Sequence, residues 1–88
     1  MLKLDLTNDA KKFIEQLDAK PFRQIFKKIL AHLDDPEPQD TKALTGYPYR
    51  RADVGEFRII YRFEQEVLLV ILIGKRNDDE VYRKLERK

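Results

Sequence analysis

A run of seven apolar residues, Val67–Ile73, constrains the fold of this chain more than any other segment. It has no polar alternation, and a strand with that pattern is covered on both faces of its sheet. The run is far shorter than the ~20 residues that a helix needs to cross a bilayer. In a chain of 88 residues, one helical hairpin can cover one face only. The sequence therefore predicts that the C-terminal segment or a partner shelters the other face.

The first half of the chain predicts one strand followed by a helical hairpin. Leucines alternate with polar residues over positions 2–6, which is typical of a strand with one apolar face. Thr7 and Asn8 are good helix caps. The next apolar residues recur at helical spacing, at Ala10, Phe13, Ile14 and Leu17. A second helix is expected from Pro21, and its apolar stripe is Phe22, Ile25, Phe26, Ile29, Leu30 and Leu33. Both stripes are expected to pack on a sheet.

The second half predicts an antiparallel three-strand meander. Its strands are expected at 49–53, 57–63 and 67–73, with turns at Val54-Gly55 and residues 64–66. Residues 34–48, which include Pro36 and Pro38, are expected to form a loop. A short last helix is expected to begin near Asn77 and to carry Val81 and Leu85. The fold class is α+β, a single domain over residues 1–88 with the helices packed on one face of the sheet.

Several function classes are excluded by composition. The chain has no cysteine and one histidine, so disulfides, thiolate sites and multi-histidine metal sites are ruled out. We expect no metal and no cofactor. Charged residues within the first five positions argue against a signal peptide, and no membrane association is expected. These features predict a cytoplasmic protein.

Basic residues concentrate in the second half of the chain. The first 45 residues carry eight basic and eight acidic groups, whereas the rest carry ten basic and eight acidic. A turn at Val54-Gly55 would pair residues whose numbers sum to 109, and would set Arg51 opposite Arg58 with Arg62 on the same face. Like charges in a cross-strand pair repel, so the arrangement makes sense if a phosphate binds there. The alternative is that these arginines are ordinary solvated surface residues.

Two motifs carry a resemblance to a known family. The segment Tyr49-Arg-Arg-Ala-Asp-Val-Gly-Glu-Phe-Arg-Ile-Ile-Tyr61 resembles the Y-R-x-R-x-G-x-Y-R-x-x-Y signature of the RelE/ParE superfamily of bacterial toxins from type II toxin–antitoxin systems. Gly74-Lys-Arg-Asn-Asp-Asp-Glu-Val-Tyr82 resembles the G-K-R-x-x-x-x-V-Y segment of its RelE branch. Lys42-Ala-Leu-Thr-Gly46 resembles the K-L-x-G that precedes the meander. The element order agrees over essentially the whole chain.

The resemblance implies an endoribonuclease that cuts mRNA in the ribosomal decoding site. In RelE-type toxins a ribose 2′-OH attacks the adjacent phosphate, which leaves a 2′,3′-cyclic phosphate and a 5′-OH. The reaction needs removal of the 2′-OH proton, neutralisation of developing charge and protonation of the leaving oxygen. The family uses lysines, arginines and a tyrosine for this chemistry, without a metal.

The resemblance also implies roles for individual residues. Arg58 resembles the strand arginine that binds the phosphate, Arg76 resembles an arginine that stabilises charge or donates a proton, and Tyr82 resembles a tyrosine that stacks on a base or transfers a proton. Arg51 falls where the family often has a catalytic lysine. Asp53 departs from the family, in which a basic residue is common at this position. Further contacts to RNA are expected from Tyr49, Arg50, Arg62 and Lys75.

The implied partners are the ribosome with its mRNA and a RelB-like antitoxin. The antitoxin would wrap the toxin, cover its basic face and connect it to operator DNA, so the toxin would act as a co-repressor only through it. Two alternatives stay open: a ParE-like gyrase inhibitor without RNA chemistry, and a toxin fold that has lost activity and serves only in repression.

Overall fold

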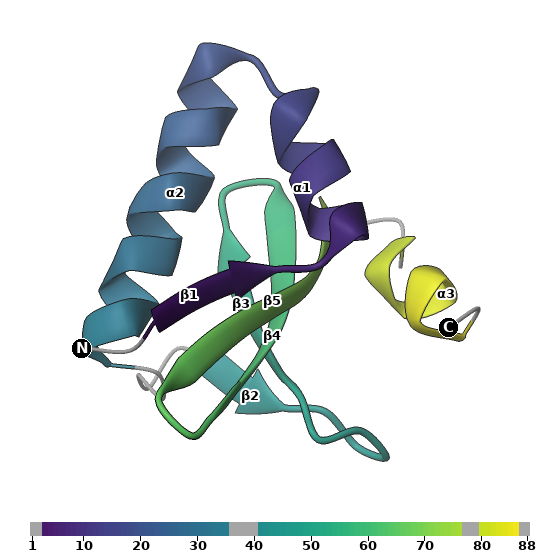
Figure 1. Cartoon of the computed structure of the whole chain (residues 1–88). Helices are drawn as coiled ribbons and strands as arrows, with labels where there is room; N and C mark the ends of the chain where they lie inside the picture. The colour runs from purple at the N-terminus through teal and green to yellow at the C-terminus, as the bar shows by residue number, and fades with distance from the viewer. Residues whose placement is uncertain (1–2, 36–40, 77–79, 87–88) are drawn as a thin grey trace.

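The computed structural model describes residues 3–35, 41–76 and 80–86. It confirms the α+β class (Figure 1). The elements follow one another as β1 (Lys3–Leu6), α1 (Asn8–Glu15), α2 (Ala19–Asp34), β2 (Thr41–Ala43), β3 (Arg50–Val54), β4 (Phe57–Glu64), β5 (Val67–Lys75) and α3 (Glu80–Glu86). The expected start of the last helix at Asn77 lies outside the described residues.

The five strands form one sheet in the order β1-β5-β4-β3-β2. Strands β3, β4 and β5 form the predicted antiparallel meander. Strand β1 pairs in parallel with β5, so the N-terminal strand adds to one edge of the meander. Strand β2 was not predicted, because Thr41–Ala43 lies in the segment expected to be a loop. This strand is three residues long, and its residues show no apolar alternation. It is a strand because it pairs with β3.

The predicted register of the β3–β4 hairpin is wrong. The turn is Gly55-Glu56, Val54 pairs with Phe57, and Asp53 lies opposite Arg58. Two-residue hairpin turns need a positive φ at their first central position, and Gly55 supplies it with a φ of +57°. A turn at Val54-Gly55 would instead place the glycine second. The observed register replaces a repulsive arginine pair with an ion pair.

The helical hairpin covers one face of the sheet. Thr7 caps α1 through its hydroxyl oxygen, which accepts the N–H of Ala10 at 3.2 Å. The buried residues of this core are Ala10, Ile25, Ile29, Leu33, Ala52, Ile59, Tyr61, Leu68, Val70 and Ile73. The odd-numbered residues of β4, Phe57 to Phe63, share this face as predicted. His32, in the last turn of α2, is also buried and stacks on Tyr61 with ring centroids 4.8 Å apart.

The apolar stripe of α2 is wider than the part of it that packs against the sheet. Ile25, Ile29 and Leu33 are buried, but Phe22, Phe26 and Leu30 stay 38%, 42% and 45% exposed. The prediction that all six face the sheet is therefore wrong. Residues four apart form two adjacent rows on this helix, and the sheet receives only one of them.

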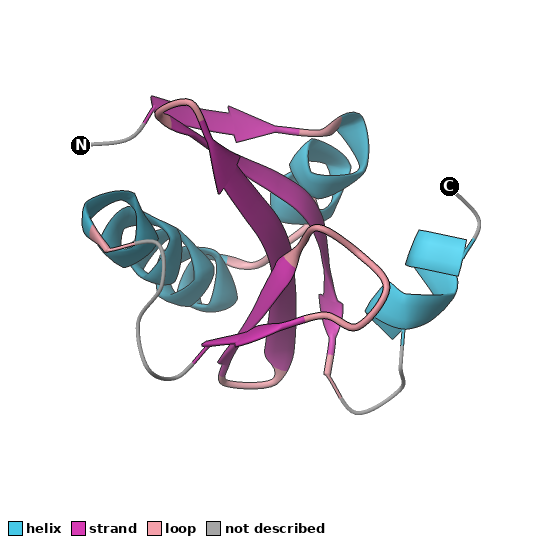
Figure 2. Cartoon of the chain, turned by 90° about the horizontal axis from the view of Figure 1, so that it is seen from below, coloured by secondary structure: helices cyan, strands magenta, loops and turns pink. Residues whose placement is uncertain are grey.

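Helix α3 covers the opposite face of the sheet (Figure 2), so the expectation that the helices pack on one face holds for α1 and α2 only. Its Val81 and Leu85 pack with Ile60, Ile71 and Leu72 in a second core. A bulge in β5 makes this possible, because Ile60 pairs with Leu72 while the next residue of β4 pairs with Val70. The sequence predicted that either the C-terminal segment or a partner covers the second face of Val67–Ile73. In the structure the C-terminal helix α3 covers it. No helix in the described ranges is long and apolar enough to cross a membrane.

Candidate functional site

Arg58 and Asp53 form a paired contact across the β3–β4 hairpin. The Nε of Arg58 donates to Oδ1 of Asp53 at 2.7 Å, and its Nη2 donates to Oδ2 at 3.2 Å. The hydrogen bond from Arg58 lowers the pKa of Asp53, and the charges of Arg76 and Arg51 add to this effect against the opposing effect of burial. The same hydrogen bond raises the pKa of Arg58. The carboxylate is therefore ionised at neutral pH.

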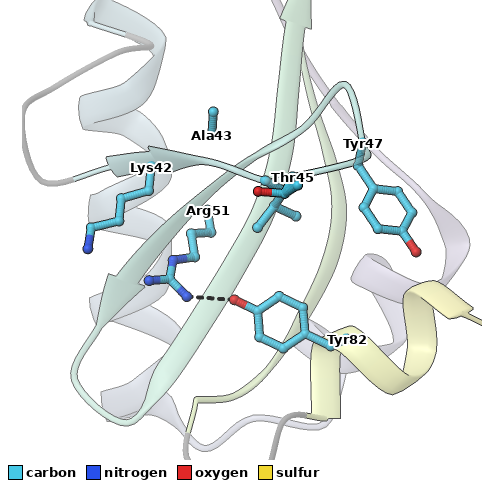
Figure 3. Close-up of a pocket in the computed structure, with 7 residues that line it drawn as sticks. Lys42, Ala43, Thr45, Tyr47, Arg51 and Tyr82 are labelled. Atoms are coloured by element: carbon cyan, nitrogen blue, oxygen red, sulfur yellow. Dashed lines mark hydrogen bonds between the residues drawn. The ribbon is translucent and has the colours of Figure 1, made fainter.

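Two arginines converge on the hydroxyl of Tyr82. Nη1 of Arg51 donates to the Tyr82 oxygen at 2.6 Å (Figure 3), and Nη1 of Arg58 donates to it at 3.1 Å. The guanidinium carbon of Arg58 also lies 5.5 Å from the centre of the Tyr82 ring. A phenol oxygen offers two acceptor positions and one proton. With both positions occupied by guanidiniums, the proton of Tyr82 is available to a third group.

The Tyr82 ring forms one wall of a hollow of about 330 Å³ between the β2–β3 connection and α3 (Figure 3). The lining residues are Lys42, Ala43, Leu44, Thr45, Tyr47, Arg51 and Tyr82. Tyr47 stacks on Tyr49 with ring centroids 5.9 Å apart. The hollow combines aromatic walls with two cationic side chains, which suits a ligand that has a flat ring beside a negative charge.

Arg76 lies at the same end of the sheet. Its backbone N–H donates to the Glu56 carbonyl at 3.0 Å, and its Nη1 donates to the Gly55 carbonyl at 3.3 Å. Arg76 is exposed, and its charge contributes to lowering the pKa of Asp53. The structure thus joins three of the four residues expected to be catalytic, Arg51, Arg58 and Tyr82, by direct contacts, and places Arg76 at the same end of the sheet.

The residues expected to contact RNA are more dispersed. Arg50 lies on the helical-hairpin face, and its Nη2 donates to the Thr41 hydroxyl at 3.1 Å. Lys75 pairs with Phe57 on that same face. Arg62 shares the face of Arg58 but lies toward the other end of β4, in a hollow with Asp5 and Glu64. The remaining one, Tyr49, packs at the edge of the second core near the site.

Sequence reasoning missed Asp53 as a member of the site. The position of Gly55 was a usable signal. With Gly55-Glu56 as the turn, Val54 pairs with Phe57, and the next pair outward is Asp53 with Arg58. Placing the glycine at the first turn position would have set the carboxylate opposite the arginine. In the described part of the chain, no three His, Asp or Glu side chains gather where they could hold a metal ion.

Gly74 allows α3 to approach the sheet. A Cβ at this position would lie 3.0 Å from Cγ1 of Val81 and 3.3 Å from Cδ of Glu80. Gly74→Ala is therefore expected to overpack the second core and lower the free energy of unfolding by about 1–3 kcal/mol. Urea unfolding measures this loss. Adding Val81→Ala removes the methyl group that the new Cβ would contact too closely. The double variant should therefore lose less free energy of unfolding than the two single variants lose in sum.

The Asp53 carboxylate predicts how stability depends on pH. Because its pKa is lowered by folding, its contribution is present above its unfolded pKa of about 3.9 and is lost as pH falls through the folded value. Asp53→Asn should therefore cost about 1 kcal/mol at pH 7, and the gap should close below pH 4. Urea midpoints from pH 7 to pH 3 test this expectation. A gap that stays constant over this range would contradict it.

Comparison with known proteins identifies the family. The model of the ParE toxin of the type II toxin–antitoxin system parDE matches residues 4–80. No curated protein sequence matches the chain. The RelE toxin in the intact E. coli RelBE toxin–antitoxin complex is 26% identical, with a TM-score of 0.76 over 88% of this chain and 99% of that one.

Two further structures support the fold. A double mutant of E. coli RelE in the free state has a TM-score of 0.81 at 24% identity, over 98% of this chain and 96% of that one. A chain of the archaeal RelE–RelB complex from Pyrococcus horikoshii has a TM-score of 0.75 at 19% identity, over 88% and 97%. With the family match covering most of its length, the chain belongs to the ParE toxin family of type II toxin–antitoxin systems, within the RelE/ParE superfamily.

Proposed function

We propose that this toxin is a ribosome-dependent endoribonuclease that cleaves mRNA in the decoding site. The observation that carries the proposal is the convergence of Arg51 and Arg58 on the hydroxyl of Tyr82, at the wall of an aromatic hollow. Cationic donors around a positioned hydroxyl are what phosphodiester cleavage without a metal requires. Tyr82 and Arg76 also match the segment that resembles the RelE branch.

The chemistry can be assigned to groups of the site. The 2′-oxygen of the ribose bonds to phosphorus as its proton passes to a water molecule, and the bond from phosphorus to the 5′-oxygen breaks. Guanidiniums neutralise the charge that develops on the phosphate oxygens. The Tyr82 hydroxyl donates its proton to the departing 5′-oxygen, and the nucleobase beside the cleaved bond stacks in the hollow. The single histidine is buried under the helical hairpin and takes no part.

The proposed cellular partner is a RelB-like antitoxin, and the proposed place of action is the cytoplasm. Chains similar to this one have been solved in complex with RelB. Phe22 and Phe26 stack on each other and line a hollow of about 460 Å³ rimmed by Lys20, Arg23 and Lys27. An acidic segment with apolar anchors suits this surface. Operator DNA would be reached only through the antitoxin.

A reconstituted translation reaction tests the proposal. The toxin is added to ribosomes stalled on a defined mRNA, and RNA ends are mapped with and without ribosomes. We expect cuts within the codon in the decoding site and none on mRNA alone. Arg76→Ala should lower the rate at least tenfold, whereas Arg83→Ala, which removes an exposed arginine of α3, should leave it unchanged. Equal rates for the two variants would contradict the site assignment.

The alternative is a gyrase inhibitor of the ParE type, which the name of the matching family model favours. It needs no RNA chemistry, so it predicts no cleavage in the reconstituted reaction. It also predicts inhibition of DNA supercoiling by purified gyrase, and such inhibition without mRNA cleavage would establish it.

A further inference from the structure

We propose that Arg58 is a positioning residue, held by Asp53 and holding Tyr82, and that Arg51 and Arg76 make the contacts to the RNA phosphate. This inference rests on the proposed function, because it assumes that single-stranded RNA is the ligand. It differs from the role that the resemblance implied for Arg58, which was to bind the phosphate itself.

Three N–H groups of Arg58 already have partners, among them both groups of its Nε–Nη2 edge. Arginine grips a phosphate best through two parallel N–H groups. In Arg58 the edge formed by Nε and Nη2 binds the two carboxylate oxygens of Asp53, and Nη1 binds the Tyr82 hydroxyl. The Arg58 side chain is only 11% exposed. A phosphate could reach this edge only by displacing a carboxylate of the same charge.

Arg51 and Arg76 are better placed for an incoming anion. Arg51 lines the hollow and contacts Tyr82 through one nitrogen. Arg76 is exposed just after β5. Its guanidinium donates a hydrogen bond to the Gly55 carbonyl, which holds it beside the hairpin turn. Their positive charges act on Asp53 only from a distance, whereas Arg58 shares a close ion pair with it. The pair Asp53–Arg58 therefore contributes almost no net charge to the site.

Asp53 acquires a role through this arrangement. Its carboxylate fixes the plane of the Arg58 guanidinium, and Arg58 then supplies one of the two hydrogen bonds that fix the Tyr82 oxygen. A basic residue in place of Asp53 would repel Arg58 and leave its Nε–Nη2 edge to the phosphate. The carboxylate of Asp53, at a position where the resemblance implies that a basic residue is common, thus moves the phosphate contact from Arg58 to its neighbours.

The salt dependence of RNA binding separates the two roles. Each phosphate contact to a single strand contributes about 0.7 to the slope of log K against log salt concentration. The probe is a short, fluorescently labelled 2′-O-methyl RNA, which cannot be cut, titrated with the purified chain at about 50–200 mM salt. Cleavage is measured in parallel as a single turnover on ribosome-bound mRNA.

We expect Arg51→Gln and Arg76→Gln each to reduce the slope by about 0.7. The double variant Asp53→Asn/Arg58→Gln, which keeps the net charge, should leave the slope unchanged and lower the cleavage rate at least tenfold. Lys3→Gln removes one exposed charge on β1, at the sheet edge away from β3 and β4, so it controls for net charge and should change neither quantity. Asp53→Asn alone releases the Arg58 edge and should steepen the slope.

A double variant whose slope falls as far as that of Arg51→Gln would overturn the inference, and so would one that cleaves at the normal rate. If circular dichroism shows that the double variant is unfolded, Asp53→Asn decides, and an unchanged slope overturns the inference. Failure of the unaltered chain to cut ribosome-bound mRNA would instead overturn the proposed function, which keeps the two failures distinct.

Discussion

Tyr82→Phe is expected to lower the single-turnover rate of mRNA cleavage on the ribosome by about 10²- to 10³-fold, within the range of general acid–base catalysis. The variant keeps the aromatic ring that walls the hollow but loses the oxygen that accepts from Arg51 and Arg58. It therefore removes the proposed proton donor while a base can still stack on the ring. RNA binding should change by less than threefold, a split that a general loss of structure would not produce.

Tyr47→Phe is the matched control for this prediction. Tyr47 lines the same hollow and also loses one hydroxyl, but in the proposed reaction that hydroxyl has no role. We expect its cleavage rate to stay within about threefold of the unaltered chain, a difference of less than 1 kcal/mol in the barrier. A Tyr82→Phe variant that cleaves as fast as Tyr47→Phe would show that the Tyr82 hydroxyl is not needed for the chemistry.

Leu72→Ala is expected to cost about 3 kcal/mol of the free energy of unfolding, within the range for buried leucines. Leu72 is fully buried between the sheet and α3, where it packs with Val81 and Leu85. The truncation leaves a cavity under the helix that carries Tyr82, so it should also slow cleavage. For a small domain with a total stability of about 5–10 kcal/mol, the loss is visible as a large shift of the urea midpoint.

Leu69→Ala provides the comparison on the same strand. Leu69 is half-buried at the margin of the same core, and we expect its truncation to cost about 1 kcal/mol. Equal losses for the two variants would mean that α3 does not cover this part of the sheet.

The elements of the fold were predictable because their periodicities are strong. The alternation along Phe57–Glu64 and the unbroken apolar run of β5 fixed which faces needed cover. Strand β2 was not predictable in this way, because its three residues are defined by pairing with β3 and have no pattern of their own. The extent of burial on α2 also depends on tertiary structure, since the width of the sheet decides which row of apolar residues it receives.

The residues proposed for the site could be named from the sequence, but the contacts between them could not. The resemblance to the RelE branch points to Arg51, Arg58, Arg76 and Tyr82, and in the fold Arg51 and Arg58 contact Tyr82 while Arg76 lies at the same end of the sheet. The cross-strand partners of Arg51 and Arg58 depend on where the turn places Gly55. A strand slipped by one pair exchanges every partner across the hairpin, so placing Gly55 second in the turn set Arg51 opposite Arg58. The correct register reveals Asp53 as the partner of Arg58 and changes the role that Arg58 can play.

Mapping of 5′ ends in cells tests most directly whether this toxin cuts translated mRNA. The chain is expressed without an antitoxin, and the 5′ ends of cellular RNA are sequenced beside those from cells expressing Tyr82→Phe. We predict growth arrest with new 5′-OH ends inside codons of translated messages, largely absent with the variant. Growth arrest with DNA damage and no new mRNA ends, or no arrest at all, would contradict the claim.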